Sequence, residues 1–108
     1  MSEILVDRSR APIVIVTINR PAKRNACDFA AWRDLGSVFA TLAGEGDTRL
    51  AILTGAEGHF SAGDDILAFA AVRGNAELEA AYRQSIRQCY AAIESTPFPV
   101  VAAISGVC

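Results

Sequence analysis

The chain has 108 residues, of which 52% are hydrophobic and 20% are charged, a composition typical of one globular domain. Its formal net charge is -2, and its lysines and arginines are scattered among acidic residues, so nucleic-acid binding is not expected. No apolar run reaches the ~18 residues of a membrane span, and the acidic N-terminal segment lacks the features of a signal peptide. We therefore expect a soluble cytoplasmic protein without a membrane partner.

Two β-branched runs open the chain, at residues 4–6 and 13–18, and a polar turn separates them. The sequence predicts two strands, the second buried on both faces because Ile13–Val16 is unbroken apolar sequence. Pro21 ends this strand, and Asp28 is placed to cap a helix. Apolar residues at helical spacing then predict a helix that ends at two glycines. This stripe consists of Phe29, Trp32, Leu35, Gly36, Phe39 and Leu42.

The second half of the chain continues the alternation of strands and helices. Residues 49–54 predict a third buried strand. A short helix is expected from Asp64 or Asp65, and apolar residues at helical intervals over 78–93 predict a longer amphipathic helix. Residues 100–104 predict a final buried strand. This order is typical of an α/β fold with right-handed crossovers.

The glycine-rich segment 55–65 fits neither of two familiar phosphate-binding patterns. Gly58 and Gly63 have the spacing of a P-loop, but Asp64 and Asp65 stand where Lys and Ser/Thr are required, and carboxylates would repel phosphate. The glycines also miss the G-x-G-x-x-G dinucleotide pattern. Because adjacent side chains diverge and no acid or His cluster lies nearby, a capping role is favoured for the aspartates and no metal site is expected.

Cysteine and histidine give little support for nucleophilic catalysis. Cys27, Cys89 and Cys108 form no C-x-x-C pair, and we expect all three to be reduced. His59 is the only histidine, and no spacing connects it with a cysteine. A loop residue is therefore favoured over a catalytic base, and no reactive thiol is expected.

The remaining interpretation of Phe60–Ile66 is stabilisation of negative charge by backbone donors. The segment leads from a loop into the predicted start of a helix, where peptide N–H groups face outward. Gly63 allows the backbone to approach a ligand closely. Such a turn can direct an N–H at a carbonyl oxygen that becomes negative during a reaction, the arrangement called an oxyanion hole.

Three segments in order, residues 19–26, 60–66 and 97–106, resemble motifs of the crotonase (enoyl-CoA hydratase/isomerase) superfamily. The resemblance covers about residues 13–106. It implies an α/β crotonase-like (ClpP/crotonase) spiral fold, with residues 1–108 as the N-terminal part of an acyl-CoA-binding domain. It also implies acyl-CoA as substrate, no cofactor beyond the coenzyme A of that substrate, and homo-oligomers such as trimers or hexamers.

The resemblance assigns a role to the amide after the motif's glycine, which belongs to Asp64 in this chain. This N–H would form half of an oxyanion hole that stabilises an enolate of the thioester. Two interpretations stay open for Lys23 and Arg24, contact with the CoA phosphates or an ordinary solvated pair, and Asn25 with its neighbour could simply shape their loop. The substrate contacts implied are Arg24, Ala26, Ala62, Gly63, Asp64, Asp65 and Ile66.

The sequence departs from the family pattern at Asp64, where a small residue is usual, and at Cys27, where a larger apolar residue is usual. The second oxyanion amide and the acid/base glutamate of the family would follow Cys108. We therefore expect the 108-residue chain alone to be nearly inactive. Three hypotheses follow: part of an acyl-CoA hydratase or isomerase of fatty acid metabolism, a non-catalytic CoA-binding or interaction module, or an incomplete gene product that self-associates.

Overall fold

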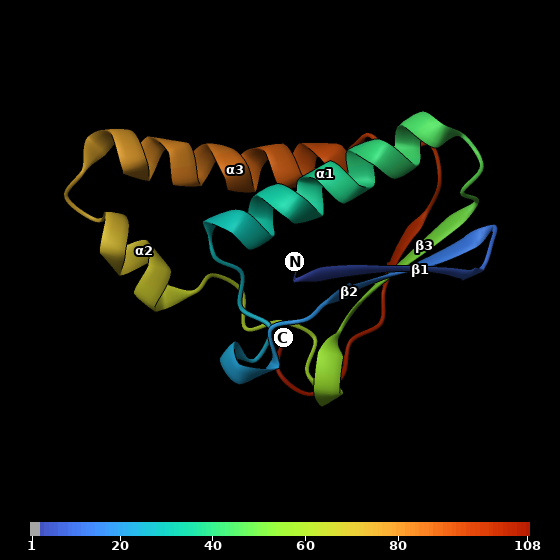
Figure 1. Cartoon of the computed structure of the whole chain (residues 1–108), viewed down its shortest axis with the longest axis horizontal. Helices are drawn as coiled ribbons and strands as arrows, with labels where there is room; N and C mark the ends of the chain where they lie inside the picture. Colours follow the sequence, from blue (N-terminus) through green and yellow to red (C-terminus); the bar gives the residue numbers. More distant parts are fainter. Residues whose placement is uncertain (1–2) are drawn as a thin grey trace.

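The computed structural model describes residues 3–108, which form one mixed sheet with two long helices on one of its faces (Figure 1). The strands lie in the order β1-β2-β3-β4. β1 is antiparallel to β2, whereas β3 and β4 continue the sheet in parallel. The strands are β1 (Ile4–Arg10), β2 (Ile13–Ile18), β3 (Leu50–Gly55) and β4 (Val100–Ala102). The helices are α1 (Phe29–Glu45), α2 (Ile66–Val72) and α3 (Ala76–Glu94), with short 3-10 turns η1 (Pro21–Lys23) and η2 (Ala56–Gly58).

Polar side chains begin all three helices, as expected for N-caps. Asp28 accepts the N–H of Ala31 at the start of α1, and Asn75 accepts that of Leu78 at the start of α3. Asp65 caps α2. The far end of α1 is closed by Gly46, whose φ of 82° is left-handed. The predicted caps at Asp28 and Asp65 are confirmed.

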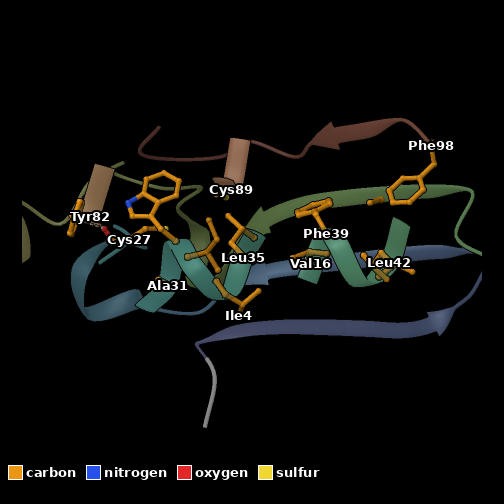
Figure 2. Close-up of a cluster of buried hydrophobic side chains, with 14 residues drawn as sticks. Ile4, Val16, Cys27, Ala31, Leu35, Phe39, Leu42, Tyr82, Cys89 and Phe98 are labelled. Atoms are coloured by element: carbon orange, nitrogen blue, oxygen red, sulfur yellow. Dashed lines mark hydrogen bonds between the residues drawn. The ribbon is translucent and has the colours of Figure 1, made fainter. Parts of the chain in front are cut away.

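The core lies between the sheet and α1 (Figure 2). Val16 on β2 faces Phe39 and Leu42 of α1, and all three side chains are buried. α3 lies beside α1 because Gly36 lacks a side chain, since a Cβ there would come within 3.0 Å of the Cα of Cys89. Figure 1 shows the two helices side by side above the sheet.

The expectations about all four strands need correction. β2 alternates buried and half-buried residues, and β3, predicted to be buried, fully buries only Ala51, because the helices cover only one face of the sheet. β1 extends to Arg10, since backbone pairing with β2 continues through a bulge and does not depend on apolar side chains. β4 ends at Ala102 and is largely exposed, because Val101 lies on the face of the sheet that the helices leave uncovered.

Among the described residues, none of the helices combines the length and the apolar character that crossing a membrane requires.

Candidate active site

A buried asparagine fixes the loop that follows β2. Arg24 and Asn25 have left-handed φ angles of 49° and 60°. The Asn25 side chain donates to the carbonyl oxygens of Ala56 and His59 at 2.9 and 2.8 Å, and its Oδ1 accepts the N–H of Arg20 at 2.9 Å. This side chain therefore joins the loop after β2 to the loop after β3.

Backbone hydrogen bonds connect this loop to the segment before α2. The N–H of Ala62 donates to the carbonyl of Arg24 at 3.0 Å. Cys27 donates to the carbonyl of Gly63 at 2.7 Å and accepts the N–H of Asp65 at 2.9 Å, which makes a short parallel bridge. The substrate contacts predicted from sequence thus lie on two joined segments: Arg24, Ala26, Ala62, Gly63, Asp64, Asp65 and Ile66.

The N–H of Asp64 is a free donor of this segment. The neighbouring amides are occupied, because Ala62 and Asp65 donate to carbonyls and Gly63 donates to the Oγ of Ser61 at 3.0 Å. Within residues 3–108, the Asp64 N–H has no hydrogen-bond partner. It follows Gly63, whose φ of 94° suits glycine. This is the amide that the sequence predicts as an oxyanion donor, and its catalytic role stays a prediction.

The amides of Leu67 and Ala68 at the start of α2 are not available to a ligand, whereas the N–H of Ile66 has no hydrogen-bond partner among the described residues. Oδ1 of Asp65 accepts the N–H groups of Leu67 and Ala68 at 3.1 and 3.2 Å. The expectation of outward-facing donors at this helix start is therefore wrong for Leu67 and Ala68, because the cap uses their amides. The free donors that remain flank the cap, at Asp64 before it and at Ile66 after it.

A small cavity of about 210 Å³ gathers most of the predicted substrate contacts. Arg24 and Gly63 do not line it, although Lys23, the neighbour of Arg24, does. Ile66 and Leu67 are 80% and 70% exposed, so they give this cavity an apolar rim that is open to a ligand. The lining residues are Lys23, Ala26, Ala62, Asp64, Asp65, Ile66 and Leu67.

A second, mainly apolar cavity of about 290 Å³ lies against the same turn. Ala62 lines both cavities, so the turn with the free amide borders each of them. Its wall includes residues of α1, α3, β2 and β3. They are Ile18, Cys27, Trp32, Leu35, Leu53, Phe60, Ser61, Ala62, Gly63, Tyr90, Ile93 and Cys108.

Two aromatic side chains form hydrogen bonds to the segments around the Asp64 turn. The helical spacing of apolar residues predicted both only as core residues and not as hydrogen-bond donors. Nε1 of Trp32 donates to Oδ1 of Asp64 at 2.8 Å. Tyr82 donates its hydroxyl to the carbonyl of Cys27 at 3.2 Å, and Figure 2 shows these two residues together. Burial raises the pKa of Tyr82 to about 12, so the phenol stays a donor at neutral pH. The signal available in the sequence was the polar atom of each ring, which needs a partner when buried.

Arg20 was not predicted as a site residue, yet it joins several parts of the site. Its guanidinium forms ion pairs with Asp65 and Asp28 at 3.3 Å and with Glu3 at 3.0 Å, and it also donates to the carbonyl of Ala26. Burial disfavours ionisation of Asp65, but the hydrogen bond from the N–H of Ala68 and the nearby Arg20 guanidinium favour it more strongly. Together these effects lower the pKa of Asp65. The available signal was an arginine two residues after an apolar strand.

Cys27 and Cys89 are buried in the core, and His59 makes a hydrogen bond between loops. Burial raises the pKa of Cys27 to about 12 and that of Cys89 to about 11, so both are protonated at neutral pH. Nδ1 of His59 accepts the N–H of Val107 at 3.0 Å, a bond within adjoining loops. In residues 3–108, no group of His, Cys, Asp and Glu gathers as a metal-binding cluster.

Comparison with known proteins gives one consistent family. Residues 8–108 match the family model for enoyl-CoA hydratase/isomerase. The chain is 31% identical over 114 residues to the mitochondrial Delta(3,5)-Delta(2,4)-dienoyl-CoA isomerase of Mus musculus, covering 97% of this chain and 35% of the relative. It is 29% identical over 106 residues to the 2,3-dehydroadipyl-CoA hydratase of Escherichia coli K12, covering 98% of this chain and 40% of that relative.

Solved structures give the same fold. An enoyl-CoA hydratase/carnithine racemase from Magnetospirillum magneticum superimposes with a TM-score of 0.89 at 36% identity, over 98% of this chain and 40% of that one. An enoyl-CoA hydratase/isomerase from Mycobacterium paratuberculosis gives 0.88 at 29% identity, over 98% and 42%. The predicted crotonase-like α/β fold is thereby confirmed, and the chain spans well under half the length of these proteins.

Proposed function

Because the chain belongs to the enoyl-CoA hydratase/isomerase family, we propose that it contributes part of an active site for acyl-CoA thioesters. In this proposal the N–H of Asp64 donates to the thioester carbonyl oxygen and stabilises the enolate that forms from it. The observation that carries the proposal is the free amide itself, on a turn that borders two cavities. A fixed donor directed at developing charge is a large source of rate enhancement.

The two cavities suggest how the substrate would lie. The cavity of about 290 Å³ is mainly apolar and suits an acyl chain. The smaller cavity offers Lys23 near its rim together with the apolar side chains of Ile66 and Leu67, a combination that suits the pantetheine arm and a phosphate of CoA. Coenzyme A enters as part of the substrate, so the proposal requires no separate cofactor.

The reaction catalysed, hydration or isomerisation, depends on an acid/base group. Among the described residues, the carboxylates that line the two cavities are Asp64 and Asp65. Asp65 is engaged as a helix cap and with Arg20, and Asp64 bonds to Trp32. Both carboxylates thus have partners within this chain, and the proposal assigns binding and charge stabilisation to it and leaves the reaction type open.

A second candidate function is acyl-CoA binding without turnover. It is favoured by the fact that two cavities and a free amide meet at one turn, an arrangement that can bind a thioester without moving a proton. The two candidates differ in one measurable respect, because only the first includes conversion of a 2-enoyl-CoA or 3-enoyl-CoA thioester.

The experiment compares two substitutions of one residue in the protein as its source produces it. Asp64→Pro removes the backbone N–H, whereas Asp64→Ala keeps it and removes only the carboxylate. We expect Asp64→Pro to lower kcat by about 10²- to 10³-fold, the usual effect of losing one oxyanion donor, while Asp64→Ala stays active. Binding is followed by the fluorescence of Trp32, the single tryptophan, which lines the larger cavity.

Circular dichroism and thermal unfolding establish that the Asp64→Pro protein is folded before its kinetics are compared. Equal kcat for the two variants would contradict the role of the amide. Binding of acyl-CoA with no turnover by the wild-type protein would support the second candidate, and the absence of binding would exclude both.

A further inference from the structure

The residue that supplies the proposed oxyanion donor also carries a negative charge. Asp64 is exposed, and its carboxylate is attached to the same residue as the free N–H. An enolate oxygen at that N–H would be anionic, and two negative charges a few ångströms apart repel each other strongly in a partly desolvated site. The position of this carboxylate is therefore important for any reaction that passes through an enolate.

Trp32 determines where the carboxylate lies. Its Nε1 is 2.8 Å from Oδ1 of Asp64. The indole is only 8% exposed, and the ring of Tyr90 packs against it edge to face with centroids 5.7 Å apart. Because the ring is held on the first turns of α1, its N–H direction is fixed, whereas the Asp64 side chain has no other hydrogen bond within residues 3–108.

The pair also connects the two cavities. Trp32 lines the larger apolar cavity, and Asp64 lines the smaller one. A hydrogen bond to a charged acceptor is stronger than a neutral one, so the indole can keep the carboxylate on its own side of the turn. Trp32 therefore does more than fill the core between α1 and its neighbours, because its N–H also fixes the position of the Asp64 carboxylate.

We propose that Trp32 is a positioning residue that holds the Asp64 carboxylate at the indole and prevents it from turning toward an anionic acyl oxygen at the Asp64 amide. This inference rests on the proposed function, since it requires that an enolate forms at this amide. It accounts for an acidic residue at a place in the turn where a free carboxylate would oppose catalysis.

The test is a double-mutant cycle in the protein as its source produces it, with steady-state kinetics on an enoyl-CoA thioester. The variants are Trp32→Phe, Asp64→Asn and the double variant. Asn keeps the acceptor and the shape of Asp but removes the charge. We expect Trp32→Phe to lower kcat about tenfold, the equivalent of one charged hydrogen bond, with little change in KM.

The double variant distinguishes positioning from packing. If Trp32 acts on the carboxylate, the double variant should recover the kcat of Asp64→Asn, because the charge is then absent. An equal loss on removing Trp32 in both backgrounds, or no loss in either, would overturn the inference. A wild-type protein that neither binds nor converts acyl-CoA would instead defeat the proposed function, and this inference with it.

A second measurement does not depend on activity. The single tryptophan gives one indole N–H signal in a proton NMR spectrum. Asp64→Ala should shift this signal and speed its exchange with water, whereas Asp47→Ala, which removes an exposed carboxylate far along the chain, should leave it unchanged. An indole signal that does not respond to Asp64→Ala would show that the hydrogen bond is not formed in solution and would overturn the inference.

Discussion

Asn25 shows how one buried amide can fix two loops of the site. Its side chain is fully buried, and it donates to two carbonyl oxygens and accepts one backbone N–H. These are the bonds that only an amide can make at this position, because a carboxylate has no N–H to donate. The interpretation of Asn25 as a residue that shapes its loop is therefore supported by its contacts.

Asn25→Asp should strongly destabilise the protein. The new carboxylate would face the carbonyl oxygens of Ala56 and His59, so two hydrogen bonds would become repulsive contacts in a buried position. We expect the free energy of unfolding to fall by about 2–3 kcal/mol, measured by urea denaturation. Asn75→Asp is the matched control, because that exposed cap keeps its acceptor for Leu78, and it should be neutral. Equal losses in the two variants would contradict this account.

At the scale of elements, Arg20 connects the N-termini of two helices. Its guanidinium contacts Asp28, the cap of α1, and Asp65, the cap of α2, and it lies two residues after the end of β2. The side chain is 10% exposed, so these pairs are only weakly screened by solvent. The relative positions of a strand and two helices around the Asp64 turn thus depend on one side chain.

Arg20→Lys should weaken this connection although the charge is kept. A lysine ammonium cannot reach the separate acceptors that the planar guanidinium contacts together. We expect a loss of about 1–2 kcal/mol in the free energy of unfolding, measured by urea denaturation at pH 7. The control is Arg8→Lys, because the Arg8 pair with Glu45 is about half exposed and should contribute nothing measurable. A larger loss at Arg8 than at Arg20 would contradict the assignment.

The ion pair between Arg20 and Asp65 predicts how the difference in unfolding free energy between wild type and Arg20→Lys depends on pH. The pKa of Asp65 in the folded protein lies below its ordinary value of 3.8, so the stability that Asp65 contributes is present above about pH 4. This contribution disappears as the pH falls through the folded pKa and the carboxylate becomes protonated. The difference in unfolding free energy between the two proteins should therefore shrink below about pH 4, and a difference that stays constant down to pH 3 would argue against the pairing.

How well the sequence predicted each interaction depends on how far apart its two residues lie in the chain. The caps at Asp28 and Asp65 were predicted because a cap and its amides lie within three residues of each other. The contacts of Arg20 were not, since Asp65 is 45 residues away in the chain. A sequence motif predicted the Asp64 amide as a donor. That this N–H has no acceptor within the protein depends on a distant contact, because Cys27 bonds to Gly63 and Asp65 on either side of it.

At the scale of the whole molecule, the sheet has one covered and one uncovered face. α1 and α3 lie on the face that carries Val14 and Val16. The opposite face carries Ile15, Ile52 and Val101, which pair by register across β2, β3 and β4, and Leu5 lies on the same face of β1 opposite Thr17. Leu5 and Val101 are 45% and 50% exposed. Contiguous apolar surface of this kind favours association, and β4 adds an unpaired strand edge beside it.

We therefore expect the 108-residue chain to self-associate through this face as its concentration rises, and Val101→Lys to reduce the association without unfolding the protein. A lysine in the middle of a desolvated contact is unfavourable, whereas at an exposed edge strand it costs little stability. Sedimentation velocity over a range of concentrations measures the effect. Leu78→Lys is the matched control, because Leu78 is 49% exposed but lies on α3, away from the sheet. If both lysine variants reduce association equally, general charge repulsion explains the result and the sheet face is not the contact. If neither does, the chain associates elsewhere or remains monomeric.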